Sequence, residues 1–158
     1  MAAEKGRRAT SGYVKVEGID ELRKSLRKMQ DKVAKQNAQQ TLKDDFRAAA
    51  EMVAETARQR APLGPARAKL GPGALRDTIR PKGALRGATV LAGGIKGVKY
   101  AGPIAYGWPT RPDKAKGWRG GPIKGYNFLR YALLRRSPDI TRRMETTVRR
   151  LIEEVKGL

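Results

Sequence analysis

The amino-acid sequence predicts an α+β fold in which a small antiparallel sheet packs against one long helix. Apolar residues recur every three or four positions over residues 42–61, a spacing typical of an amphipathic helix. The main segments with β character follow this helix, and helical spacing returns near the C-terminus. We therefore expect a single domain over residues 13–158, with N-terminal and C-terminal helices and long basic loops, after a flexible arm at residues 1–12.

The pattern changes twice before the long helix. Residues 13–17 alternate in polarity and predict a short edge strand, whereas residues 19–29 have helical spacing and acidic residues in their first turn. Residues 30–40 are compatible either with a link between two helices or with a backward extension of the long helix. Pro62 ends the long helix, because proline cannot continue the hydrogen-bond ladder.

Two strands are expected after the long helix. Residues 63–73 are rich in glycine and proline and predict a loop insertion. Residues 74–80 predict a strand that Pro81 terminates, and residues 87–92 predict a second strand. The two strands together predict a β-hairpin or the core of a meander. Residues 108–125 predict a second long loop insertion.

The C-terminal region predicts two helices. Helical spacing returns over residues 127–134. Ser137 and Pro138 then match a capping residue followed by proline at the first helical position. We therefore expect the last helix to begin there and to end at Gly157.

Composition excludes most familiar catalytic sites. The chain has no cysteine and no histidine, so it lacks disulfides, thiolate zinc sites and the commonest general base. Asp44 and Asp45 lie beside Lys43 and Arg47, which favours solvated charge over catalysis. We expect no enzymatic activity, catalytic residue, metal site or cofactor. No apolar run approaches the roughly 20 residues of a membrane span, so no membrane contact is expected.

Positive charge is the strongest global feature, with 35 Lys and Arg against 15 Asp and Glu. The excess is concentrated in residues 62–136, together with most glycines and prolines, which indicates basic loops and strand edges. Such a surface attracts phosphate polymers or acidic proteins, or it is simply solvated without a fixed ligand. The core of the second loop combines Trp118, which either stacks on a partner or pins its loop, with four cations. Candidate contact residues there are Arg111, Lys114, Lys116, Trp118 and Arg119.

A succession of short motifs extends over most of the chain: GIDEL at 18–22, a long helix ending at Ala61-Pro62, GALRDTI at 73–79, YAGPIAYG at 100–107 and NFLRYA at 127–132. Their order and spacing resemble tailed-phage neck and tail-completion proteins, the family related to the lambda-type minor tail protein Z. Two departures are the insertion at 63–72 and Ala105, where family members tend to have glutamate. The positions that carry the resemblance are Pro62, Gly73, Leu75, Arg76, Tyr100, Ala101, Gly107, Phe128, Leu129 and Ala132.

The resemblance implies a structural virion protein at the head–tail junction, in the neck and tail region, where it takes part in joining head to tail. It implies a homo-oligomeric ring, expected to be a hexamer, that contacts neighbouring neck, tail-terminator or tail-tube proteins. Nonspecific contact with genomic DNA in the lumen is a further implied interaction. The protein would then reside in the host cytoplasm during assembly, and a prophage or gene-transfer particle is another source of such a chain.

A free, sequence-nonspecific nucleic-acid-binding protein is the alternative function. The basic composition, with aromatic residues near cations, supports this alternative. The sequence has no helix-turn-helix, RRM-like or KH-like signature, which argues against it. Tight, salt-sensitive DNA binding by a monomer favours the alternative, whereas a discrete ring that ignores DNA favours the assembly component.

Replacement of the four loop cations Arg111, Lys114, Lys116 and Arg119 by neutral residues tests whether they lie at a subunit or DNA-facing surface. We expect impaired assembly or genome retention, because the attraction to acidic partners or phosphates is lost. The measurement is the titre of infectious particles. A normal titre contradicts the hypothesis.

Overall fold

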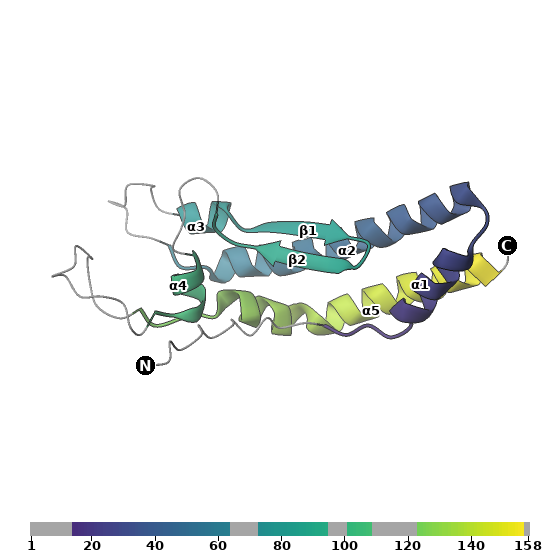
Figure 1. Ribbon diagram of the computed structural model, residues 1–158. Helices are drawn as coiled ribbons and strands as arrows, with labels where there is room; N and C mark the ends of the chain where they lie inside the picture. The colour runs from purple at the N-terminus through teal and green to yellow at the C-terminus, as the bar shows by residue number, and fades with distance from the viewer. Residues whose placement is uncertain (1–13, 64–72, 95–100, 109–122, 157–158) are drawn as a thin grey trace, which may run out of the picture.

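The computed structural model describes residues 14–63, 73–94, 101–108 and 123–156 (Figure 1). The flexible arm, most of the first loop insertion and the interior of the second lie outside these residues. Seven elements follow one another along the chain: α1 (Ile19–Lys28), α2 (Lys32–Arg60), α3 (Ala74–Asp77), β1 (Arg80–Ala84), β2 (Gly87–Leu91), α4 (Ala101–Tyr106) and α5 (Phe128–Lys156).

The long helix α2 is the central element of the fold. The β1–β2 hairpin packs on α2, and α5 packs along it in the opposite chain direction (Figure 1). Helix α1 lies against the C-terminal part of α5. The α+β prediction is confirmed: a two-stranded antiparallel sheet packs against a long helix, with helices before and after it. The alanine-rich stripe of α2 is buried and supplies much of the core: Ala49, Ala50, Val53, Ala54 and Ala57.

Helix α2 begins ten residues earlier than its most regular apolar stripe. Asp31 caps it, because its Oδ1 accepts hydrogen bonds from the backbone N–H of Val33 at 2.8 Å and of Ala34 at 3.1 Å. Of the two alternatives for residues 30–40, the backward extension is therefore correct. The helix ends at Arg60, and Ala61 is extended before Pro62, as proline requires of the residue that precedes it.

The first strand of the hairpin is displaced from its predicted position. Residues 74–77 form the short helix α3, and β1 covers Arg80–Ala84 and includes Pro81. Leu75 and Ile79 are both buried, and their separation of four residues fits a helical turn as well as an alternating strand. Pro81 is tolerated because, among the described residues, β1 pairs with β2 alone, so one edge of β1 needs no N–H donor.

The strand predicted at residues 13–17 is also wrong. Residues 14–17 have no regular structure, and Val14 and Val16 pack on the core, half-buried. Alternating burial produced the same pattern as a strand, but no partner strand pairs with this segment within the described residues.

Buried Thr78 connects α3 to the end of β2. Its Oγ1 donates to the carbonyl of Leu75 at 2.7 Å and accepts from the N–H of Gly93 at 2.8 Å. The guanidinium of Arg80 adds hydrogen bonds to the carbonyls of Thr78 and Gly93. These contacts fix how the chain enters and leaves the hairpin, whose register pairs Arg80 with Leu91.

The two predicted C-terminal helices are one helix, α5, which continues through Pro138. Proline removes one backbone hydrogen bond inside a helix but is tolerated in the first turn, so Ser137 and Pro138 have the pattern of a helix start. Packing on both sides of the proline holds the helix together, since Phe128 and Ala132 are buried before it and Met144 and Val148 after it. Tertiary contacts therefore outweigh the local stop signal.

The segment after α4 crosses closely over the segment before α5. The N–H groups of Tyr126 and Asn127 donate to the carbonyls of Ile104 and Ala105. Gly107 has a φ of 85°, and an added Cβ there would lie 2.9 Å from the backbone nitrogen of Gly125. Glycine at both positions permits this approach.

Among the described residues, no helix combines the length and the apolar character that crossing a bilayer requires.

Gly83→Ala is expected to destabilise the fold by about 1–3 kcal/mol, the usual cost of overpacking. Gly83 lies in β1 against α2. A Cβ added there would lie 2.9 Å from the backbone nitrogen of Arg47 and 2.9 Å from the carbonyl oxygen of Lys43. The measurement is urea unfolding monitored by circular dichroism. Gly102→Ala in α4 is the control, since an added Cβ has open space there. Equal stability of the two variants contradicts the close contact.

Candidate functional site: an arginine-rich groove between α2 and α5

Polar side chains of α2 and α5 line an open groove of about 930 Å³. Helix α5 contributes all three basic residues of the lining, and α2 contributes two of the three carboxylates. The opposite directions of the two helices bring residues far apart in sequence into this groove. It is lined by Thr41, Asp44, Asp45, Ala48, Asp139, Arg142, Arg143, Thr146, Thr147 and Arg150.

Asp45 is the strongest polar link between α2 and α5. Its Oδ1 accepts from Nη2 and Nε of Arg143 at 2.6 and 3.1 Å, and its Oδ2 accepts from Oγ1 of Thr147 at 2.7 Å. The Asp45 side chain is only 15% exposed. A carboxylate with both oxygens occupied in this way holds two helices together and is poorly placed for acid–base chemistry.

A smaller pocket of about 300 Å³ lies further along the same helix pair. We call it the arginine pocket, and it is lined by Thr56, Gln59, Arg60, Tyr131, Arg135 and Arg136. The lining contains three guanidinium groups and no carboxylate. Clustered arginines of this kind favour an anionic ligand, because their planar donors match carboxylate and phosphate oxygens.

Two of the three guanidinium groups in the arginine pocket are held by neighbours. The Arg60 guanidinium lies 4.5 Å from the centre of the Tyr131 ring, a cation–π contact. Nε of Arg136 donates to Oγ1 of Thr56 at 2.8 Å, and its Nη1 lies 3.5 Å from the Asp139 carboxylate. Arg135 is exposed and makes no ion pair with any residue in the described part of the chain. The pocket therefore presents oriented cations with unused donors.

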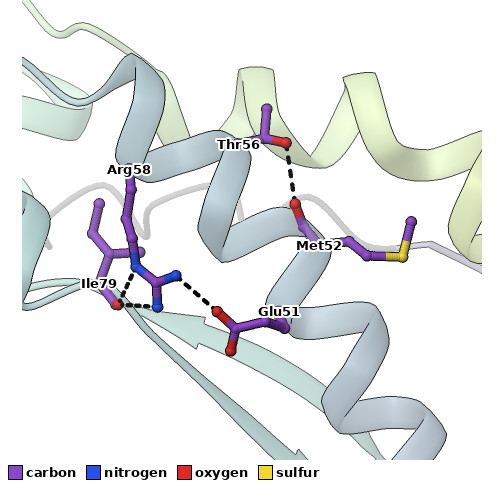
Figure 2. Close-up of polar contacts among 5 residues, drawn as sticks. All are labelled: Glu51, Met52, Thr56, Arg58 and Ile79. Carbon is purple, nitrogen blue, oxygen red and sulfur yellow. Dashed lines mark hydrogen bonds and ion pairs between the residues drawn. The ribbon is translucent and has the colours of Figure 1, made fainter.

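Several other arginines bind backbone carbonyls and stabilise the fold. Arg58 donates through Nε and Nη2 to the carbonyl of Ile79 and through Nη1 to Glu51, which ties α2 to the start of β1 (Figure 2). Arg76 donates to the carbonyl of Ala61 at 2.8 Å and so joins α3 to the end of α2. A part of the large positive charge is therefore structural and is not available for binding.

Six of the seven arginines of α5 follow a simple pattern. Adjacent pairs occur at positions 135–136, 142–143 and 149–150, seven residues apart. In each pair the second arginine has an acidic partner: Arg136 with Asp139, Arg143 with Asp45, and Arg150 with Glu154. The first arginine of each pair is exposed and makes no ion pair with the described residues; these are Arg135, Arg142 and Arg149.

The candidate contact residues of the second loop, Arg111 to Arg119, lie outside the described residues, so their placement stays a prediction. Sequence reasoning missed Arg60, Tyr131 and the three arginine pairs. The pairing of α2 with α5 that creates the arginine pocket has no local signal. The seven-residue repeat of arginine pairs, in contrast, is visible in the sequence and was a usable indication.

The positions that carry the family resemblance are described with the exception of Tyr100. Leu75, Ala101, Phe128 and Ala132 are buried core residues, and Leu129 packs on the same core, partly buried. Gly73 and Gly107 have positive φ angles, and Arg76 binds the carbonyl of Ala61 next to Pro62. These positions belong to α3, α4, the end of α2 and the start of α5, which lie at one end of the molecule (Figure 1). Their role in this chain is packing.

Comparisons of the chain with known protein families, with curated proteins and with solved structures find no match. Within the described residues, no group of three or more acidic, histidine or cysteine side chains is placed to hold a metal ion.

Asp45→Ala is expected to lower the free energy of unfolding by about 1–3 kcal/mol, because the Arg143 guanidinium and the Thr147 hydroxyl lose a half-buried charged partner. Thermal and urea unfolding measure the effect. Asp44→Ala is the matched control, since exposed Asp44 contacts only the Gln40 amide within its own helix. Similar small effects of both variants would show that Asp45 does not hold α2 to α5.

Proposed function

We propose that this protein is a structural component of a tailed-phage virion, a neck or tail-completion protein that takes part in joining head and tail. The observation that carries the proposal is the convergence of the family-like positions. They are spread over residues 62–132, yet those among the described residues lie at one end of the molecule, where α2 ends, α3 and α4 lie and α5 begins. A set of motifs that serves one packing arrangement supports likeness of the whole fold to that family.

Exposed apolar side chains at the same end of the molecule support a role in assembly. Tyr106 is 50% exposed, and Tyr126 and Leu134 are each 65% exposed. They belong to α4, to the segment before α5 and to the first turns of α5. Tyrosine and large apolar residues are enriched at the centres of protein interfaces. A ring subunit that contacts its copies or the proteins above and below it needs such a surface.

In this role the protein carries out no catalytic step. It assembles as a homo-oligomeric ring, expected to be a hexamer, and its partners are other copies and neighbouring neck, tail-terminator or tail-tube proteins. Its location is the neck and tail region of the virion, after assembly in the host cytoplasm. The basic surface suits a subunit past which DNA moves, because phosphate contacts do not depend on sequence.

A free, nonspecific nucleic-acid-binding protein is the second candidate. Arg135, Arg142 and Arg149 favour it, since they make no ion pair with the described residues and form an exposed basic surface on α5. Both candidates involve contact with DNA, so DNA binding alone does not separate them. Presence of the protein in assembled particles separates the two candidates.

Deletion of the gene from the genome that carries it tests the proposed role. We expect separate DNA-filled heads and free tails, seen by electron microscopy, because the joining component is missing. Wild-type particles should contain the protein in a fixed copy number, measured by mass spectrometry, and expression in trans should restore joined particles.

Joined, infectious particles from the deletion strain would refute the proposal. Absence of the protein from purified wild-type particles, combined with its association with cellular nucleic acid, would establish the free nucleic-acid-binding protein instead.

A further inference from the structure

Three of the exposed arginines of α5 form a regular row. Arg135, Arg142 and Arg149 are separated by seven residues each, which is two helical turns and about 10.5 Å along the helix axis. Seven residues rotate the side chain by only about 20°, so all three lie on nearly the same face of α5. We call this row the arginine ladder.

The cations of the ladder are not neutralised within the described residues. Asp139 and Glu154 already pair with Arg136 and Arg150. Glu145 and Glu153 lie three or four residues from ladder positions, but neither makes an ion pair with them. Helix α5 as a whole carries seven arginines against four acidic residues, so the helix has an excess of positive charge.

The ladder is continuous with the arginine pocket. Arg135 belongs to both, and the pocket adds Arg60, which the Tyr131 ring holds in place. An arginine fixed by an aromatic ring loses less side-chain entropy when it binds an anion. The row of cations therefore begins on α2 at the arginine pocket and runs along α5.

We propose that the arginine ladder, together with Arg60, binds the phosphate backbone of duplex DNA without reading its sequence. A row of unpaired guanidinium groups at equal intervals complements a polyanion whose charges also repeat regularly along its length. An acidic protein is the competing partner, and the experiment below separates the two. Guanidinium groups form paired hydrogen bonds with phosphate oxygens, and such contacts carry no base specificity.

The DNA-binding surface deepens the proposed function and rests on it for the source of the DNA, the packaged genome. Binding is measured on purified full-length protein, whereas the virion role is measured on particles. Failure of one is therefore distinguishable from failure of the other.

Fluorescence anisotropy with a short duplex of mixed sequence, over a series of salt concentrations, tests the proposal. The variant Arg135→Gln/Arg142→Gln/Arg149→Gln removes the ladder while it keeps good helix formers on an exposed face. Loss of three phosphate contacts is expected to reduce the slope of log K against log salt by about 2.7. We expect affinity at near-physiological salt to fall about tenfold to a hundredfold.

The matched control is Lys24→Gln/Arg27→Gln/Lys28→Gln, which removes three exposed charges from α1. Both triple variants have the same net charge, so a specific effect of the ladder appears as a difference between them. The corresponding Arg→Lys ladder variant should keep most of the slope, because each phosphate contact still releases a counterion. Circular dichroism checks that all variants keep their helix content.

Absence of DNA binding by the wild-type protein at near-physiological salt overturns the proposal. Equal loss in the ladder variant and the α1 control also overturns it, since net charge then explains the binding. Wild-type binding to polyglutamate as tight as to DNA, with equal loss in the ladder variant, overturns it in favour of an acidic protein partner.

Discussion

The close packing of α2 against two different partners is the constraint on which the rest of the structure depends. Alanines occupy much of its buried surface, which lets α5 approach along one side, while β1 meets the helix backbone at Gly83 on the other. Small side chains give close contact and high packing density, but they leave no space for a larger side chain. Within the described part of the chain the sheet has two strands, and a two-stranded hairpin is not expected to be stable alone, so its fold depends on this support.

Arginine serves two purposes in this protein, and the contacts separate them. Arg58 and Arg76 donate to backbone carbonyls at the ends of elements, and Arg143 holds a carboxylate between helices. Such arginines satisfy polar groups that would otherwise lose hydrogen bonds on burial. Arg135, Arg142 and Arg149 lack such partners among the described residues. Net charge counts both kinds equally, whereas only the second kind is free to bind a polyanion.

The proposed assembly role and the proposed DNA contact place different demands on different surfaces. Exposed tyrosines of α4 and of the segment before α5 suit contacts with protein, because they combine apolar area with a polar group. The arginine ladder runs further along α5, toward the end where α1 packs. A ring subunit needs both kinds of surface, one that binds its neighbours and one that tolerates the passage of a polyanion.

The sequence by itself determined the long helix, the helix at residues 19–28, the second strand and the α+β class, because each follows from local periodicity and helix-ending residues. Only the tertiary structure decided that α3 is helical, that Pro81 lies inside a strand and that α5 passes through Pro138. At these places packing against α2 or the core outweighs a local preference of a few kcal/mol at most. The groove and the arginine pocket were equally beyond local reasoning, since the groove brings Asp45 to Arg143 and the pocket brings Arg60 to Tyr131. The repeat of arginine pairs is visible in the sequence, and the ion pairs of Arg136 with Asp139 and of Arg150 with Glu154 are local to α5. Only the ion pair of Arg143 with Asp45 depends on how α2 and α5 pack.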